Sequence, residues 1–114
     1  MIGKLAIAIS GGPRPSEIVE ILVKAEKLGY ESGWVAEGHG GDQFAIIASA
    51  ASKTEHLNLG TAISSIFVRT PPTVAMAAAT LDDISGGRFI FRSGFQSQSS
   101  GGARTWCSLW KADP

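Results

Sequence analysis

The sequence predicts an α/β protein built on a parallel sheet, and three observations carry this prediction. Strand-like and helix-like segments alternate three times, and a fourth strand-like segment follows them. The strand-like segments are short and nearly continuous apolar runs, which are typical of strands buried on both faces of a sheet. The alternation repeats every 25 to 30 residues or so, roughly the length of a strand with a helical crossover, so we expect successive strands to be parallel and wound in one hand.

The first strand and helix are expected between Lys4 and Gly29. Lys4 to Ser10 is the first apolar run, and the glycines and proline after it end the strand. Ser16 is expected to cap a helix that runs through Leu28, because apolar residues recur there at helical spacing. Gly29 is expected to close that helix in the left-handed conformation. The glycines before the helix lack the third glycine of a dinucleotide-binding fingerprint, so we interpret them as a turn.

The second strand is expected to end at Glu37, and the loop after it holds two candidate catalytic side chains. Glu37 and His39 bring a carboxylate and an imidazole into a loop whose glycines let the backbone approach a ligand closely. A histidine can donate, accept or carry charge, which suits a redox pocket. The alternative for His39 is an ordinary exposed loop residue, and His56 is expected to face solvent. Asp42 is expected to cap a second helix over residues 43–54.

The stretch from Leu57 to Pro72 is the main candidate for a ligand site. It begins as an apolar strand whose side chains become very small at Gly60, and the hydroxyl residues Ser64 and Ser65 follow where the strand should end. Arg69 precedes a pair of prolines that start the next helix. Ligands of parallel α/β proteins lie at the carboxyl ends of strands, so the stretch would suit a flat ring with a phosphate tail. An ordinary strand–loop–helix joint packed with small residues explains the pattern equally well.

The third helix is expected from Thr73 to Ile84, followed by the fourth strand. The helix is apolar almost all round, so we expect neighbouring elements to cover most of it. Asp82 and Asp83 point about 100° apart in a helix, so we interpret them as a solvated helix end and not as a catalytic pair. Two glycines are expected to end the helix, and the fourth strand begins at Arg88.

Composition narrows the classes of partner. Ten basic and ten acidic residues balance, which argues against a nucleic-acid surface. No apolar run reaches the roughly 18 residues that a membrane helix needs. The single Cys107 excludes an internal disulfide, and the sequence offers no zinc-ligand spacing, so no metal site is expected. These features favour a cytoplasmic protein that acts on a small-molecule substrate, without nucleic-acid or membrane partners.

Five sequence blocks, in order, resemble the amino-terminal part of the luciferase-like monooxygenase superfamily, and most closely its coenzyme F-420-dependent oxidoreductase branch. The blocks are Ala25-Glu26-Lys27-Leu28-Gly29-Tyr30-Glu31-Ser32 with Trp34-Val35-Ala36-Glu37, Leu59-Gly60-Thr61-Ala62, Arg69-Thr70-Pro71-Pro72, Ala78-Ala79-Thr80-Leu81-Asp82, and Ser85-Gly86-Gly87-Arg88-Phe89. The resemblance implies a partial (β/α)8 TIM barrel over residues 1–91, made of the first three βα units plus the fourth strand. A complete barrel needs about 250 residues.

The resemblance also implies a cofactor and the residues that hold it. Relatives bind coenzyme F-420 or FMN at the carboxyl ends of the barrel strands, and we expect F-420 with FMN as the alternative. The third strand of relatives ends in a bulge under the ring, often with a non-proline cis peptide, which falls on Ile63-Ser64-Ser65-Ile66 here. Gly94 follows the fourth strand as a further cofactor-binding candidate. Glu37 and His39 correspond to the substrate side, whereas Arg69 is expected only to anchor its loop.

Two functions follow as expectations. The first is a fragment of a flavin- or deazaflavin-dependent oxidoreductase that performs hydride transfer or monooxygenation on a small organic substrate. The second is a non-catalytic remnant, or a half-barrel that works only by self-association, because an open half-barrel exposes its sheet edge. Residues 92–114 do not continue the resemblance. We interpret them as the product of a reading-frame shift near Arg92, and the alternative is a short tail whose Trp106, Leu109 and Trp110 cap the open sheet.

Overall fold

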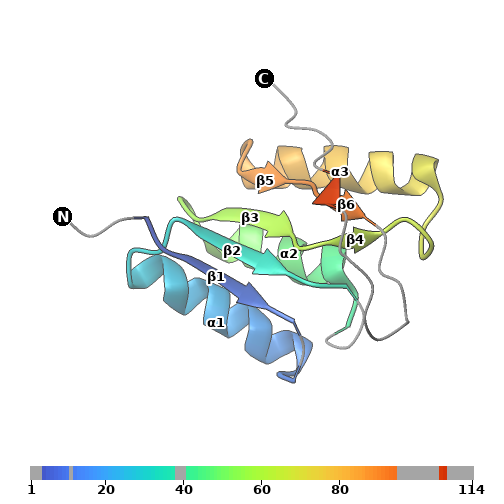
Figure 1. The fold of residues 1–114 in the computed structure, drawn as a ribbon. Coiled ribbons are helices and arrows are strands. Elements are labelled where there is room, and N and C mark those ends of the chain that lie inside the picture. Colours follow the sequence, from blue (N-terminus) through green and yellow to red (C-terminus); the bar gives the residue numbers. More distant parts are fainter. Residues whose placement is uncertain (1–3, 11, 38–40, 95–105, 108–114) are drawn as a thin grey trace.

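The computed structural model describes residues 4–10, 12–37, 41–94 and the backbone of 106–107, and Figure 1 shows their arrangement. Four strands form a parallel sheet in the order β1-β2-β3-β5. They are β1 (Ala6–Ile9), β2 (Ser32–Val35), β3 (Asn58–Thr61) and β5 (Phe89–Ile90). A second group comprises β4 (Ser64–Ser65), β6 (Ser93–Gly94) and β7 (Trp106–Cys107). The predicted alternation and parallel sheet are confirmed.

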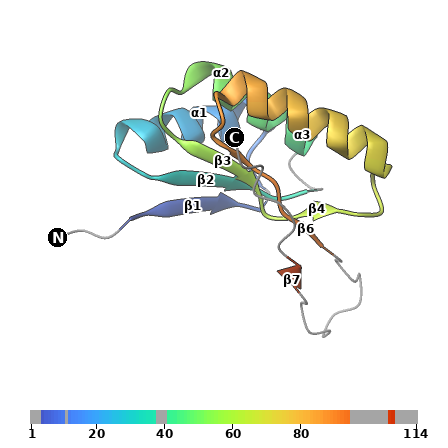
Figure 2. The ribbon, with the colours of Figure 1, turned by 90° about the horizontal axis from the view of Figure 1, so that it is seen from above.

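Three helices cover one face of the parallel sheet, as Figure 2 shows. They are α1 (Pro15–Lys27), α2 (Gln43–Lys53) and α3 (Pro71–Ser85). The core lies between these helices and the sheet, where Ile18 and Leu22 of α1 and Ile47 of α2 meet Val35 and Leu59 at 0 to 1% exposure. Strands covered by helices on one side only are the arrangement of a (β/α)8 barrel wall. The chain therefore forms three βα units and a fourth strand of such a barrel.

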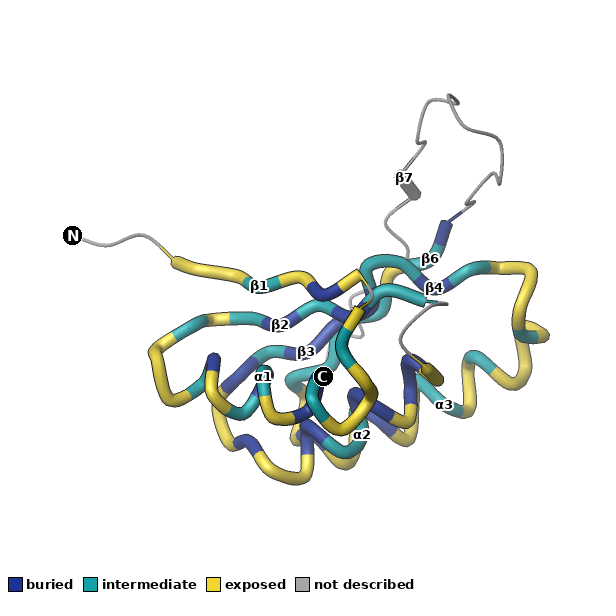
Figure 3. Tube along the Cα trace, turned by 90° about the horizontal axis from the view of Figure 1, so that it is seen from below, coloured by how far each residue is buried: buried dark blue, intermediate teal, exposed yellow. Residues whose placement is uncertain are grey.

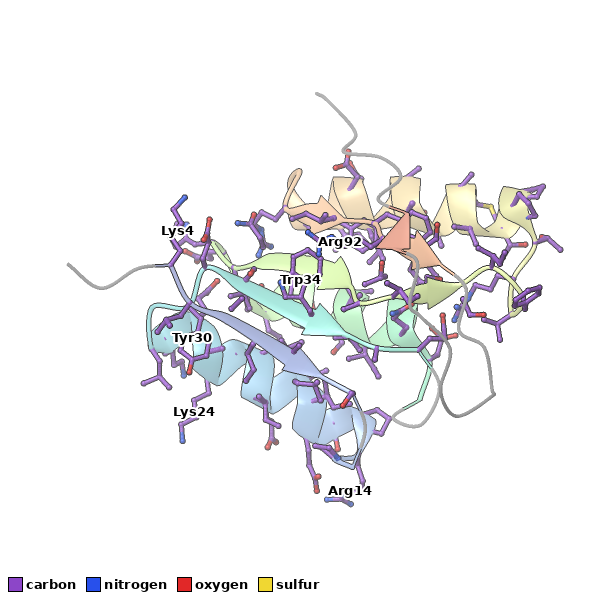
Figure 4. All side chains as sticks on the ribbon, viewed as in Figure 1. Lys4, Arg14, Lys24, Tyr30, Trp34 and Arg92 are labelled. Atoms are coloured by element: carbon purple, nitrogen blue, oxygen red, sulfur yellow. The ribbon has the colours of Figure 1, made fainter. Side chains whose placement is uncertain are left out.

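The opposite face of the sheet carries a row of aligned side chains. Strand register places Ala8, Trp34, Gly60 and Ile90 side by side across the four strands. A Cβ on Gly60 would collide with the Trp34 ring, so the glycine makes room for the indole. The Arg92 guanidinium lies 4.3 Å from the centre of that ring, and Figure 4 shows the two side chains together over the sheet. This face would point into the interior of a complete barrel.

Local capping signals explain where the helices begin and end. Asp42 caps α2 through a hydrogen bond from Ala45 N to Oδ1 at 2.9 Å, and Gly29 has a φ of 85° after α1, so both predictions are confirmed. The predicted cap at Ser16 is wrong, because the N-cap is Arg14. Glu17 accepts from the backbone N and the Nε of Arg14, at 3.0 and 2.9 Å. The proline after Arg14 takes the first helical position, where a missing N–H costs nothing.

The expectation that α3 is largely covered is wrong. Only Leu81 and Ser85 are buried in this helix, whereas Met76 is 68% exposed and Ile84 is 45% exposed. Figure 3 shows exposed and half-buried colours along most of α3. The helix is the last of its layer and packs against α2 on one side only, so its other apolar face has no neighbour in the described part of the chain.

A buried carboxylate contact joins α1 to the start of β3. Glu26 accepts hydrogen bonds from three successive backbone N–H groups, those of Glu55, His56 and Leu57, at 2.8 to 3.1 Å. The His56 side chain itself is 86% exposed, as predicted. Partial burial alone would raise the pKa of Glu26, but the hydrogen bonds outweigh it and hold the pKa below its ordinary value of 4.5.

This contact predicts a pH-dependent stability. Because the pKa of Glu26 is lower in the folded chain, its contribution is present above the unfolded value of about 4.3 and is lost as pH falls through the folded value. Glu26→Gln is expected to lower the free energy of unfolding by about 1 kcal/mol near neutral pH, and by progressively less below about pH 4.3. Urea unfolding across this range measures the difference. Glu20→Gln, at an exposed position of the same helix, is the control, and a difference that does not vary with pH contradicts the prediction.

Candidate functional site

The candidate site lies at the carboxyl-terminal edge of the parallel sheet, where short hydrogen bonds join the strand ends. Ala62 N donates to Val35 O at 2.9 Å, and Ser64 N donates to Arg92 O at 2.8 Å. The Thr61 hydroxyl donates to Arg92 O and accepts from Arg92 N, both at 2.7 Å. The buried hydroxyl therefore replaces a ladder contact between the third and fourth strands of the barrel and fixes where they end.

The four predicted cofactor-binding residues lie together at this edge. Ser64 pairs with Ser93 and Ser65 with Gly94, in parallel, and β7 adds to β6 in the antiparallel direction. Ser64 is 1% exposed, and Gly94 is also buried. A Cβ on Gly94 would lie 2.7 Å from Ile63 Cδ1, so a larger residue at this position would displace Ile63. A non-proline cis peptide joins Ala62 to Ile63, at the start of the predicted bulge.

Glu37 connects the loop after β2 to this group. Its Oε2 accepts from Ser64 Oγ at 3.3 Å and from Arg69 Nη1 at 2.6 Å. The side chains of Glu37 and Arg69 are only 11% and 15% exposed, so their ion pair is shielded from solvent more than most. Among the described residues, no donor is bonded to the other carboxylate oxygen of Glu37. One oxygen is thus held in place while the other can accept a hydrogen bond from a ligand.

Arg69 holds both ends of the β2–α2 connection. Its Nη2 donates to Asp42 Oδ2 at 3.0 Å, and its guanidinium lies 4.6 Å from the centre of the Phe44 ring. Burial alone would lower the pKa of Arg69, but the bonds and charges of Glu37 and Asp42 outweigh it and raise that pKa. The Ala45 N–H chiefly lowers the pKa of Asp42, and Arg69 adds to this effect against burial. The anchoring role expected for Arg69 is therefore a bridge between two carboxylates.

Gln43 is a member of this region that the sequence did not single out. It is 0% exposed, and its Nε2 donates to Val35 O at 2.6 Å and to Ile63 O at 3.3 Å. Its Oε1 is buried without a hydrogen-bond partner. A glutamine in the first turn of a helix ordinarily faces solvent, so the residue type alone carried no signal for this position. The spacing could have placed it near the strand ends, because it directly follows the Asp42 cap.

Two other predictions fall partly or wholly outside the described residues. His39 lies in the undescribed segment 38–40, so its role stays a prediction. Of the tail, only the backbone of Trp106–Cys107 is described, and the boundary at residue 91 also stays a prediction. The described part of the chain contains no cluster of three or more His, Cys, Asp or Glu side chains that could hold a metal ion. In the same residues, no helix has the length and hydropathy of a membrane span.

Comparisons with known proteins agree with this geometry. The F-420-dependent glucose-6-phosphate dehydrogenase of Amycolatopsis mediterranei is 32% identical over 103 residues, covering 82% of this chain and 30% of that protein. The 5,10-methylenetetrahydromethanopterin reductase of Methanopyrus kandleri is 33% identical over 82 residues, covering 71% of this chain and 24% of that protein. The solved structure of the coenzyme F-420-dependent tetrahydromethanopterin reductase of Methanopyrus kandleri superposes with a TM-score of 0.76 at 29% identity, covering 83% of this chain and 28% of that one.

The family assignment rests on most of the chain, although the relatives are much longer. The chain spans between 24% and 30% of the length of these two curated relatives. The family described as luciferase-like monooxygenase matches residues 3–100, a range that includes every strand end of the candidate site. With this match and the barrel-wall fold, the chain belongs to the luciferase-like monooxygenase family.

Proposed function

We propose that this chain provides part of the cofactor site of a coenzyme F-420-dependent oxidoreductase that acts on a small organic substrate. One observation carries the proposal: Ile63, Ser64, Ser65 and Gly94 lie together at the carboxyl-terminal edge of a parallel sheet, within hydrogen-bond reach of Glu37. Ligands of barrel enzymes bind at this edge. The names of two relatives that are about one-third identical favour F-420, and FMN is the alternative.

The residues at this edge fit a flat ring better than a compact charged ligand. Ser64, Ser65 and Gly94 are small and uncharged, so the backbone that carries them can approach a ring closely. The positive charge of Arg69 is already paired with Glu37 and Asp42, which leaves it unsuited to hold a phosphate by itself. When bound, the cofactor ring supplies the redox chemistry by taking or giving a hydride, or, in the FMN case, by activating oxygen.

The protein groups have distinct parts in this proposal. The Ile63–Ser65 backbone supports the ring, and Gly94 keeps the space beside Ile63 free of a further side chain. Glu37 presents its unpaired carboxylate oxygen to a donor on the substrate or the ring. Arg69 and Ser64 fix the orientation of that carboxylate, so that its ordering cost is met before a ligand arrives. His39 is proposed to act beside Glu37 on the substrate side.

Titration of the purified chain with F-420 and with FMN tests the proposal. We expect a saturable change in cofactor fluorescence with a dissociation constant below about 1 mM, because part of the complete binding surface is present. Gly94→Leu should weaken this binding at least about tenfold, since its side chain would occupy the space of Ile63. Leu28→Ala, at an exposed position after α1, is the control. No saturable change with either cofactor up to the millimolar range contradicts the proposal.

Self-association is a second candidate function, and the uncovered face of the sheet favours it. Ala6 and Ala8 of β1 are exposed, and β1 is an edge of the parallel sheet with a partner on one side only among the described strands. Such an edge can pair with another strand. The same titration separates the two candidates when it is repeated at several protein concentrations. Affinity that rises with protein concentration means that copies assemble to form the site, whereas a constant affinity means that one chain suffices.

A further inference from the structure

The buried amide of Gln43 has a geometry that the proposed function leaves unexplained. Gln43 is the first residue of α2, yet its side chain turns inward and is 0% exposed. Burying an amide is unfavourable unless its polar atoms find partners, and only the nitrogen has them here. The arrangement therefore costs stability at Oε1 and recovers it at Nε2.

Both acceptors of the Gln43 amide are backbone carbonyls at the ligand edge. Val35 O lies at the carboxyl end of β2 and accepts a second bond from Ala62 N at 2.9 Å. Ile63 O lies directly before Ser64, in the connection between β3 and β4. One side chain therefore ties the end of β2 to the segment that leads into the predicted ring support.

The amide cannot turn over without losing these contacts. Both of its N–H groups are used, one on each carbonyl, and rotation by half a turn would place Oε1 against two acceptors. We propose that Gln43 is a positioning residue, which holds the Ile63 carbonyl and thereby sets where the Ser64–Ser65 backbone lies beneath the cofactor ring. The part that concerns the ring rests on the proposed function, and the hold on the backbone is independent of it.

Gln43→Met tests the hold on the backbone directly. Methionine has a similar volume and removes both N–H donors together with the unpartnered Oε1, so the melting temperature is expected to change by less than about 4 °C. Local order should nevertheless fall, with amide hydrogen exchange at Ser64 and Ser65 faster by about fivefold or more. Affinity for F-420 should fall about tenfold, because the ring support is no longer preorganised.

Thr54→Val is the matched control, at the opposite end of the same helix. Thr54 is buried and its hydroxyl donates to Ala50 O at 2.8 Å, so this variant also removes a buried side-chain hydrogen bond. It should lower the melting temperature and leave the exchange of Ser64 and the affinity for F-420 unchanged. If Gln43→Met leaves Ser64 exchange at its original rate, or speeds exchange everywhere in proportion to lost stability, the positioning role is overturned. If the unaltered chain binds neither cofactor, the proposed function fails, while the exchange measurement still decides the role of Gln43.

Discussion

Replacing Arg88 with methionine is expected to lower the free energy of unfolding by about 3 kcal/mol. All five N–H groups of this half-buried guanidinium donate to the chain: Nε to Ser85 O at 2.6 Å, Nη1 to Thr54 Oγ1 and Leu57 O at 2.9 Å each, and Nη2 to Ala51 O and Thr54 O at 3.0 Å each. Methionine preserves much of the apolar stem but leaves carbonyls at the end of α2 and before β3 without their donor. Arg88 therefore fastens α2, α3 and β3 together at the edge opposite the candidate site.

Arg14→Met provides the comparison for Arg88. The Arg14 side chain is 79% exposed and its guanidinium pairs with Glu17 at 2.9 Å, so its loss is expected to cost no more than about 1 kcal/mol. Arg88→Lys should recover only part of the stability, because an ammonium group has three donors and lacks the planar fork. Urea unfolding of the three variants measures the differences. An Arg88→Met chain as stable as Arg14→Met would show that the network adds nothing beyond a surface ion pair.

Gly33→Ala is expected to cost about 2 to 3 kcal/mol, although it adds only one methyl group. Gly33 lies in β2 beneath α1, and an added Cβ would collide with Leu22 Cδ2 and lie 3.5 Å from Leu57 Cδ2. Both leucines are at most 1% exposed, so neither can swing aside into solvent. The helix must move away from the sheet or Leu22 must leave its preferred rotamer, and either change weakens the core.

A double-mutant cycle with Leu22→Ala isolates the cause. Leu22→Ala alone should cost about 2 to 5 kcal/mol through the cavity that it leaves. In the double variant the alanine methyl group at position 33 occupies part of that cavity, so the combined loss should be smaller than the sum of the single losses by at least about 1 kcal/mol. Thermal or urea unfolding of the four chains gives the coupling. Strict additivity would mean that the close approach of Gly33 and Leu22 does not limit packing.

Local signals in the sequence predicted most of the elements correctly. The alternation of apolar runs and helical periodicity predicted three βα units and a fourth strand. Asp42, Gly29 and the proline pair before α3 marked helix ends where the structure has them. Each of these signals acts through backbone geometry or a hydrogen bond within a few residues, so it can be interpreted without knowing the rest of the fold. The error at Ser16 arose between two neighbouring capping possibilities and displaced one helix end only.

The candidate site was predictable in position but not in its internal contacts. Ser64, Ser65 and Glu37 follow strand ends, and parallel strands bring such ends to one edge, so their proximity follows from topology. The bridge from Arg69 to Glu37 and Asp42 links residues 27 and 32 positions apart, and nothing local to Arg69 indicates those partners. Whether the gathered residues bind a cofactor and act on a substrate stays a prediction.

The sequence by itself determined the fold class, the order of the elements and the edge at which the candidate site lies, because periodicity, caps and chain direction are local properties. Only the tertiary structure decided that Gln43 is buried, that Trp34 crosses Gly60 beneath Arg92, and that α3 is exposed although it is apolar. Burial depends on which neighbours reach a residue from distant parts of the chain. An apolar helix at the end of a layer has a neighbour on one side only, and no pattern within the helix records that.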